Sequence, residues 1–288
     1  MRLPFLLLTP ACVLLGLGTA FWTSGRINVF YFILALGGAL AAHISVNALN
    51  EYFDFKSGLD LRTKPTPFSG GSGTLPASPD KAHWALLTGI ITFGITGLIG
   101  IYFLTVRGFA LLPLGLLGLL LVFFYTPWIT HNPWLCLIAP GFGFGPLMVM
   151  GTNFVLTGTY SWIALAASMI PFFLVNNLLL INQFPDVEAD KRAGRKNLPI
   201  IFGAKNSVII YGIFIFLTYL LIIVSFHFDL LPQLSLIALS TMIIAVPTFI
   251  GVLRYYLNLK KLVPYMGLNV IITIATPLLI AVGLFISN

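Results

Sequence analysis

Two short motifs of acids and amides contain the residues of this chain that could do chemistry. Each motif has one asparagine followed by two aspartates: Asn50, Asp54 and Asp60 in the first, Asn182, Asp186 and Asp190 in the second. Most of the eight Asp and Glu residues of the chain fall within these two stretches. Mg²⁺ prefers hard oxygen ligands, usually one or two carboxylates together with waters and substrate phosphate oxygens. The motifs therefore indicate a site for Mg²⁺ ions that bridge a diphosphate.

The spacing within the motifs predicts that their side chains point the same way. Asn50 and Asp54 are four residues apart, and the second motif advances in steps of four. Residues four apart share one face of a helix. Ser57-Gly58 would let the chain turn back before Asp60, and Pro185 loosens a helix by removing one backbone donor.

Basic residues flank both motifs and could bind a diphosphate through charge-assisted hydrogen bonds. They are Lys56, Arg62 and Lys64 beside the first motif, and Lys191, Arg192, Arg195 and Lys196 beside the second. The histidines are scattered and the two cysteines lie in apolar segments, so a zinc site is not expected. A single motif of this kind could be ordinary helix-end polarity, but two copies with basic flanks favour a functional site.

The composition of the chain indicates which elements must position these residues. Hydrophobic residues make up 58% of the 288, charged residues 8%, and the mean hydropathy is +1.00, whereas a soluble domain has about a quarter charged residues. The chain is therefore expected to be an all-α polytopic membrane protein, because uniformly apolar runs of about 20 residues span as helices. Nine such runs are predicted, at 4–22, 28–49, 83–106, 109–127, 134–156, 161–182, 206–225, 231–252 and 264–286. They would form a bundle around a cytoplasm-facing cavity.

The basic residues also predict the orientation in the membrane. With nine spans, only Arg26 and Arg107 of the 15 Lys and Arg residues fall on one side. The side rich in Lys and Arg is normally cytoplasmic. This places the N-terminus and both motifs inside and the C-terminus outside.

No soluble domain is predicted, so residues 1–288 are expected to form a single transmembrane domain. Each motif follows an even-numbered span, which allows an internal repeat of 1–130 and 131–260. The glycine-rich stretch Ser69–Gly73 could be a flexible linker or a lid over the diphosphate. Gly141–Pro146 is expected to let helices pack closely through small residues.

Taken together, the motifs resemble those of a known family. Residues 50–60 resemble the first aspartate-rich motif of the UbiA-type intramembrane prenyltransferases, and residues 182–198 resemble the second. The resemblance implies transfer of a prenyl group from an isoprenyl diphosphate, with two or more Mg²⁺ ions as cofactor. The implied catalytic and metal-ligating residues are Asn50, Asp54, Asp60, Asp186 and Asp190. The implied diphosphate contacts are Lys56, Arg62, Lys64, Lys191, Arg192, Lys196 and Asn182.

The first motif also suggests a subfamily. Asp54 and Asp60 are six residues apart, which resembles the menaquinone-type dihydroxynaphthoate polyprenyltransferases. Glu51 stands where Asp is frequent, and Asn197 where Thr is frequent. Only Arg2 precedes the first span, where the family often has several arginines. Tyr125 could be an interfacial anchor or a ring that stabilises a carbocation or orients an aromatic acceptor.

Other functions remain compatible with the sequence. The acceptor could be a hydroxybenzoate, homogentisate, a chlorophyllide or haem, or a glycerol-phosphate lipid. A different class is a cation-coupled transporter with intramembrane carboxylates. The expected partners are the diphosphate, a small aromatic acceptor and the lipid bilayer, and no nucleic acid.

Overall fold

The computed structural model describes residues 3–63 and 65–287, and within them the chain forms helices and no strands. The longer helices are α1 (Leu8–Ser24), α2 (Val29–Lys56), α4 (Ala82–Arg107), α5 (Leu112–Phe124), α6 (Pro133–Phe142), α8 (Trp162–Asn182), α11 (Gly203–His227), α12 (Met242–Tyr255) and α13 (Leu259–Ile286). Short α-helices are α3 (Thr74–Ala77), α7 (Gly151–Thr157), α9 (Val187–Arg192) and α10 (Leu198–Ile201). The remaining segments are a π-helical stretch, η5 (Gly143–Met150), and the 3-10 helices η1 (Leu3–Leu7), η2 (Pro79–Lys81), η3 (Phe109–Leu111), η4 (Ile129–His131) and η6 (Gln233–Thr241).

Eight helical segments of the described chain are long and apolar enough to cross a membrane. They are Phe5–Ser24, Val29–Lys56, Pro79–Arg107, Pro133–Thr157, Trp162–Asn182, Gly203–His227, Gln233–Tyr255 and Leu259–Ile286. The remaining predicted run, 109–127, is present as a shorter apolar helix, Phe109–Phe124. The all-α polytopic membrane fold is therefore confirmed, while a count of nine spans stays a prediction.

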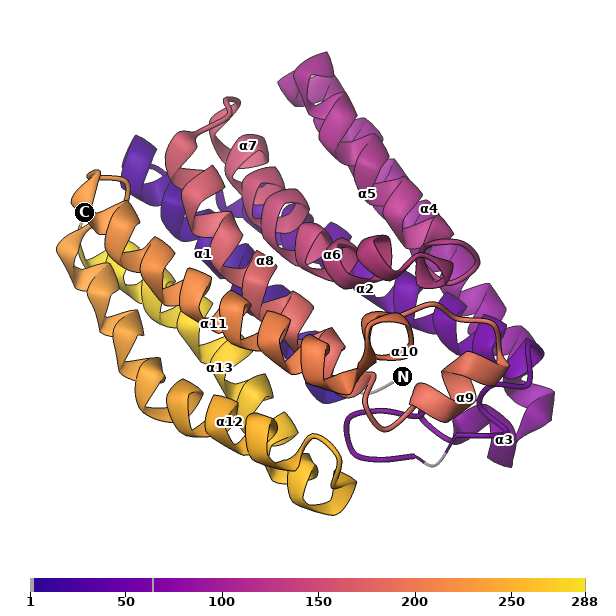
Figure 1. The fold of residues 1–288 in the computed structure, drawn as a ribbon. Coiled ribbons are helices and arrows are strands. Elements are labelled where there is room, and N and C mark those ends of the chain that lie inside the picture. Colours follow the sequence, from indigo (N-terminus) through magenta and orange to yellow (C-terminus); the bar gives the residue numbers. More distant parts are fainter. Residues whose placement is uncertain (1–2, 64, 288) are drawn as a thin grey trace.

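The helices are packed around α8, which lies between α6, α11 and α13 (Figure 1). In the most apolar window of each span, 67% of α8 is buried against only 11% of the Pro79–Arg107 span. The α4–α5 hairpin lies at one edge of the bundle, where α4 pairs with α2 (Figure 1). The α4 side of the bundle therefore exposes most of its residues, and its inner face lines an apolar cavity described below.

Glycines at the start of the π-helical stretch let two spans approach closely. A Cβ atom on Gly141 would lie 2.1 Å from the backbone oxygen of Phe172, and one on Gly145 would lie 2.3 Å from that of Ser168. Only glycine fits at such distances, and small residues of this kind commonly form helix contacts in membranes. The predicted close packing of Gly141–Pro146 is confirmed.

Polar side chains that are buried between the spans form hydrogen bonds with one another. Asn153 donates to Thr19 Oγ1 at 3.1 Å, and the Tyr211 hydroxyl donates to Asn269 Oδ1 at 2.8 Å. Such interhelical bonds help to fix how the helices pack.

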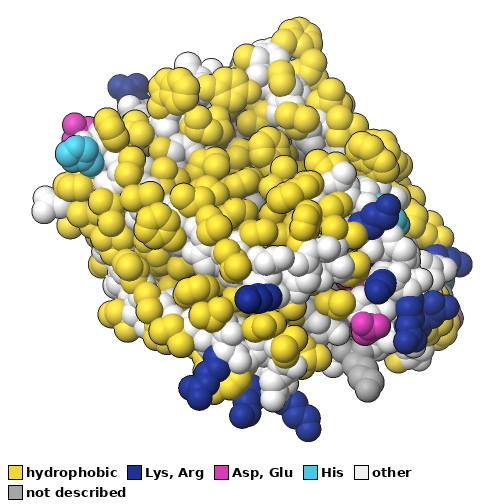
Figure 2. Space-filling view, viewed as in Figure 1, with side chains coloured by type: hydrophobic (Ala, Val, Ile, Leu, Met, Phe, Trp, Pro, Cys, Tyr) yellow, Lys and Arg dark blue, Asp and Glu magenta, His cyan; other side chains and the backbone are white. Residues whose placement is uncertain are grey.

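The surface separates apolar from charged residues. Figure 2 shows a broad apolar face, with Lys and Arg side chains gathered along its lower and right margins. These margins include the region of α9 and α10, which follow the second motif (Figure 1). The chain is an integral membrane protein, and the basic margin lies at the same end of the bundle as the motifs.

Candidate active site

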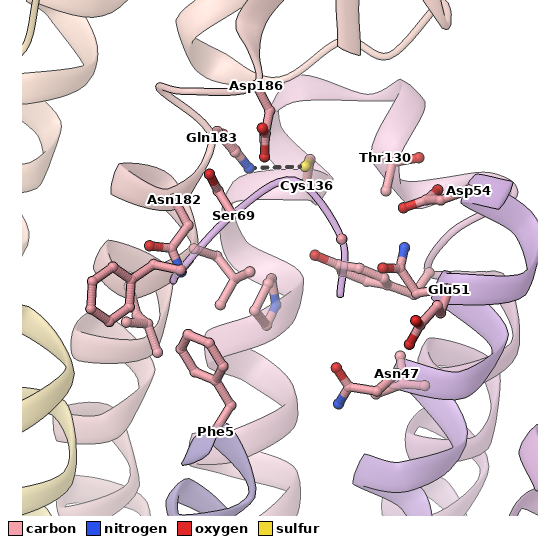
Figure 3. A pocket seen from close by; sticks show the side chains of 18 of the residues that line it. Phe5, Asn47, Glu51, Asp54, Ser69, Thr130, Cys136, Asn182, Gln183 and Asp186 are labelled. Atoms are coloured by element: carbon pink, nitrogen blue, oxygen red, sulfur yellow. Dashed lines mark hydrogen bonds between the residues drawn. The ribbon is translucent and has the colours of Figure 1, made fainter. Parts of the chain in front are cut away.

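Both motifs line one cavity of about 300 Å³ where α2 and α8 end (Figure 3). We call it the polar cavity because it contains the acid and amide side chains of both motifs. Its walls also include the loop Ser69–Ser72, Tyr125 and the α6 residue Cys136. The sequence predicted two separate motifs on one membrane face, and the structure brings them together across a single cavity.

The first motif lies in the last two turns of α2 and the turn that follows. Asn50 donates to Thr126 Oγ1 at 3.1 Å, and Asp54 is buried a turn later. The chain then reverses at Gly58, whose φ is 74°, and the amide of Asp60 lies 3.4 Å from the backbone oxygen of Asp54. This turn explains how a carboxylate six residues beyond Asp54 still reaches the cavity.

The second motif spans the end of α8 and the short helix α9. Asn182 is buried in the last turn of α8, and its Oδ1 has no hydrogen-bond partner among the residues described. Asp186 precedes α9 and accepts a hydrogen bond from the amide of Gly70 at 2.9 Å. Asp190, inside α9, is only 4% exposed.

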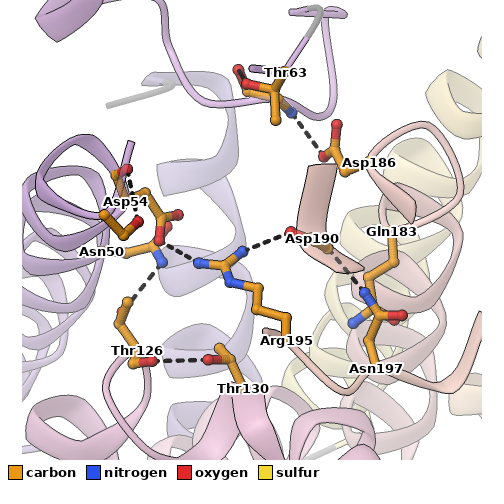
Figure 4. A network of polar contacts seen from close by, with 12 residues as sticks. Asn50, Asp54, Thr63, Thr126, Thr130, Gln183, Asp186, Asp190, Arg195 and Asn197 are labelled. Atoms are coloured by element: carbon orange, nitrogen blue, oxygen red, sulfur yellow. Dashed lines mark hydrogen bonds and ion pairs between the residues drawn. The ribbon is translucent and has the colours of Figure 1, made fainter. Parts of the chain in front are cut away.

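Arg195 connects the two motifs, and its importance was not predicted. Its guanidinium forms ion pairs with Asp54 from α2 and with Asp190 from α9, the latter at 3.2 Å (Figure 4). Its side chain is 17% exposed. The sequence identified Arg195 only as one of several flanking cations, whereas the structure places it at the centre of the site.

Asn197 helps to hold the carboxylate of Asp190 in place. Its Nδ2 donates to Asp190 Oδ2 at 2.8 Å, and its Oδ1 accepts from the amide of Ile200 at 3.1 Å, which caps α10. In the sequence, Asn197 was distinguished only as a departure from the frequent Thr. The structure shows a single side chain that orients a carboxylate and begins a helix.

The charges of the network are mutually dependent. Burial raises the pKa of Asp190, and the guanidinium of Arg195 opposes this shift. Burial also disfavours the charge on Arg195, but the carboxylates of Asp54 and Asp190 outweigh this effect and raise its pKa. Arg195 is therefore a permanent cation that favours the ionised form of Asp190 against the effect of burial.

The other flanking cations that the structure describes do not line the cavity. Lys64 lies outside the described residues. The remaining cations predicted to contact the diphosphate have exposed side chains outside the lining; they are Lys56, Arg62, Lys191, Arg192 and Lys196. Their roles stay predictions, and they require either side-chain movement or a substrate that extends out of the cavity. Asn182, the one predicted diphosphate contact that is not a cation, is buried and lines the cavity.

The glycine-rich stretch closes over the cavity instead of extending into solvent. The Gly70 amide binds Asp186, and the Ser72 hydroxyl donates to Glu51 on α2. Gly70 and Gly71 have φ angles of 77° and 70°, which only glycine adopts at little cost. Of the two predicted interpretations, the loop geometry agrees with a lid, because it contacts carboxylates on both sides of the cavity.

Tyr125 is half-buried at the end of α5 and lines the polar cavity. Its ring is thus available to a bound molecule. Whether it contacts substrate or only anchors α5 stays a prediction.

An apolar cavity of about 360 Å³ adjoins the polar one between α2, α4, α5 and η5. The two share five lining residues: His43, Val46, Leu121, Gly143 and Phe144. At this junction, His43 Nδ1 is hydrogen-bonded to Thr9 Oγ1 at 2.7 Å, and its ring lies edge-on to Phe144. A molecule with a charged head and an apolar tail could therefore occupy both cavities.

The donor set suits Mg²⁺ only in combination with a substrate. Within the described residues, no three His, Cys, Asp or Glu side chains are close enough to hold a metal alone. Two features nevertheless fit a metal-diphosphate site: Asp54 and Asp190 already converge on one cation, and Asn182 has a buried oxygen without a partner in the part of the chain that the structure describes. Mg²⁺ commonly takes only one or two protein carboxylates and completes its shell with phosphate oxygens and water.

Comparison with known proteins identifies the family. A profile of the UbiA prenyltransferase family matches residues 9–271. The chain belongs to the UbiA prenyltransferase family. A relative, 1,4-dihydroxy-2-naphthoate octaprenyltransferase of Bacillus subtilis (strain 168), is 29% identical over 186 residues. This match covers 64% of the chain but only 58% of the relative.

Solved structures of UbiA homologues share the fold. A homologue from Aeropyrum pernix K1, in its apo form, has a TM-score of 0.74 at 15% identity, with 100% of this chain and 99% of that chain covered. A homologue from Archaeoglobus fulgidus bound to GPP and Mg²⁺ has a TM-score of 0.63 at 20% identity, covering 97% and 99%. At these identities the likeness establishes the fold, and it confirms the fold implied by the motifs.

Proposed function

We propose that this protein transfers a polyprenyl group from an isoprenyl diphosphate to an aromatic acceptor in a Mg²⁺-dependent reaction. One observation carries the proposal: carboxylates from both motifs meet at one cation in a polar cavity that continues into an apolar one. The diphosphate would occupy the polar cavity and the prenyl tail the apolar cavity. The solved homologue with bound GPP and Mg²⁺ supports this assignment.

The position of each residue in the two cavities suggests its role in the reaction. Asp54, Asp60, Asp186 and Asp190, with Asn50, would hold Mg²⁺, which when bound neutralises the charge that develops on the leaving diphosphate. As the bond between the prenyl C1 and the diphosphate oxygen breaks, the diphosphate keeps the electron pair. A ring carbon of the acceptor would then bond to C1, and the proton that this carbon loses would pass to the departed diphosphate or to solvent. The lid and the apolar walls would exclude water that could otherwise capture the allylic cation.

Dihydroxynaphthoate is the acceptor that we favour. The six-residue step between Asp54 and Asp60 resembles the menaquinone-type enzymes. The Bacillus relative, named for 1,4-dihydroxy-2-naphthoate, supports the same choice. Acceptors such as a hydroxybenzoate or a glycerol-phosphate lipid are the alternatives.

We further propose that the cavity opens toward the cytoplasm, with the N-terminus inside and the C-terminus outside. The asymmetry of Lys and Arg residues supports this orientation. A cation-coupled transporter would need carboxylates near the middle of the spans. Here Asp54 lies in the last turn of α2, and the second-motif aspartates follow α8, so the transporter is disfavoured.

An assay with purified protein, Mg²⁺, a panel of prenyl diphosphates and several aromatic acceptors tests the proposal, with product mass as the readout. Asp54→Asn and Asp186→Asn should each abolish transfer while the protein remains inserted in the membrane. If both variants kept their activity, the metal-diphosphate assignment would be wrong. Glu188→Gln is a matched control, because Glu188 lies on α9 with an exposed side chain outside the cavity lining.

A further inference from the structure

The guanidinium of Arg195 lies between the two motifs, at the position where a divalent cation could bind carboxylates of both. Its guanidinium contacts one oxygen of Asp54 and one of Asp190, side chains that are 12% and 5% exposed. The two carboxylates come from segments 136 residues apart in the chain, so the guanidinium is a bridge between both halves of the site. Figure 4 shows it lying between Asp54 and Asp190.

This bridge stabilises the site in the absence of substrate. Two buried carboxylates that face each other without a cation are costly, because burial disfavours each charge and the two repel. Arg195 offsets both effects. The backbone supports its position, since the Arg195 amide donates to the backbone carbonyl oxygen of Asp190 at 3.0 Å and the Lys196 amide donates to that of Thr130 at 3.1 Å.

The same bridge obstructs a metal ion that arrives alone. Mg²⁺ and the guanidinium would compete for the same carboxylate oxygens and repel each other. If Mg²⁺ displaced the guanidinium, Arg195 would be left as a nearly buried charge without an anion, which is strongly destabilising. A diphosphate removes this penalty, because a guanidinium binds phosphate oxygens in a bidentate manner.

We propose that Arg195 is a coupling residue that holds Asp54 and Asp190 until the diphosphate arrives and then transfers to it, so that metal and diphosphate bind cooperatively. The proposal rests on the proposed function, since it requires these carboxylates to bind the metal. Because linkage is reciprocal, the diphosphate must raise the affinity for metal by the same factor that metal raises the affinity for diphosphate. Arg195 would thus prevent the site from filling with metal when no substrate is present.

The test measures metal binding directly, without turnover. Mn²⁺ stands in for Mg²⁺, and its free concentration is followed by electron paramagnetic resonance in titrations of the purified full-length protein, with and without inorganic pyrophosphate. The variant is Arg195→Gln. The matched control is Arg254→Gln, which removes an identical charge from an exposed position on α12, outside the cavity lining.

We expect Arg195→Gln to bind Mn²⁺ alone at least about fivefold more tightly than wild type, the lower end of typical coupling between sites. Pyrophosphate should then increase its Mn²⁺ affinity by a correspondingly smaller factor than in wild type. The control should change both quantities by much less. A Mn²⁺ affinity of Arg195→Gln equal to or weaker than that of wild type or the control would overturn the proposal.

Two further outcomes are informative. If wild type shows cooperative binding of Mn²⁺ and pyrophosphate but Arg195→Gln is unchanged, only the role of Arg195 is refuted. If wild type binds no Mn²⁺ even with pyrophosphate, the proposed function itself fails. If Arg195→Gln does not fold, Arg195→Lys is tested in its place, because its single ammonium keeps the charge but cannot bind both carboxylates as the guanidinium does. Tighter binding of Mn²⁺ alone by this variant would support the proposal, and unchanged binding would overturn it.

Discussion

Replacing Gly71 by alanine tests whether the lid positions a carboxylate of the first motif. A Cβ atom on Gly71 would lie 2.5 Å from Asp60 Oδ1 and 2.9 Å from its Cγ. These atoms are at the end of a flexible side chain, so the Asp60 carboxylate would have to move away. Gly73 provides a matched control in the same loop, because it has a similar φ of 73° and a Cβ atom added there would have nothing within 4 Å.

Both substitutions place an alanine at a left-handed φ, but only Gly71→Ala also displaces the Asp60 carboxylate. A left-handed φ costs an alanine roughly 1–2 kcal/mol at either position. Only Gly71→Ala also displaces Asp60, and a hydrogen bond or ion contact of a charged group is worth about 1.5–3 kcal/mol. If Asp60 helps to hold the metal-bound diphosphate, this corresponds to a loss of roughly 10- to 150-fold in kcat/KM beyond that of Gly73→Ala.

The measurement is the steady-state transfer rate of both variants at saturating acceptor, with the diphosphate varied, alongside thermal unfolding in detergent. Similar Tm values and a much lower kcat/KM for Gly71→Ala are expected. Equal kcat/KM values for the two variants would refute the reasoning. They would mean that the loop leaves Asp60 when substrate binds, or that Asp60 has no part in the reaction.

Three further predictions concern other parts of the molecule. Asn197→Ala should lower the free energy of unfolding by about 1–2 kcal/mol, because α10 loses its N-cap and a buried carboxylate loses a donor; denaturation of the apo protein in detergent measures this. Gly141→Ala should reduce Tm and the yield of folded protein, because its Cβ would collide with a neighbouring backbone, whereas Gly37→Ala, which has open space, should not. Gly100→Leu should fill part of the apolar cavity and shift the preference of the enzyme toward prenyl diphosphates with shorter chains. Gly94→Leu, on the same helix but outside the cavity lining, should leave this preference unchanged. The product masses obtained from a mixture of chain lengths test both expectations.

The fold was largely predictable because a bilayer imposes a simple rule on sequence. A span must be a helix of about 20 apolar residues, so the predicted runs coincide with helices to within a few residues except at extended ends such as that of α2, which runs on to Lys56. The helical geometry within a span is harder to predict from the sequence. Residues 133–157 form one apolar run but three helical pieces, since Pro146 cannot donate a backbone hydrogen bond and lies within the π-helical stretch.

The candidate site was predictable in its carboxylates and not in its cation. Asn50 and Asp54 do lie four residues apart on α2, as the spacing predicted. The prediction of one shared helical face is wrong for the second motif, because α8 ends at Asn182 and α9 begins only at Val187. The aspartates of both motifs nevertheless line the same cavity. Charge alone cannot indicate which flanking residue turns inward, because every Lys and Arg beside the motifs has the same sign.

The deciding feature is a backbone turn. Gly194 follows α9 with a φ of 80°, and this left-handed residue turns the chain back so that the Arg195 amide donates to the backbone carbonyl oxygen of Asp190. The residue directly after the glycine is thereby directed at the carboxylate, while Lys196, one position later, remains exposed. An arginine is also better suited to this place than a lysine, since its planar fork reaches two carboxylates at once. The sequence Gly194-Arg195 after a carboxylate-bearing helix was therefore the signal that could have singled out this cation among its neighbours.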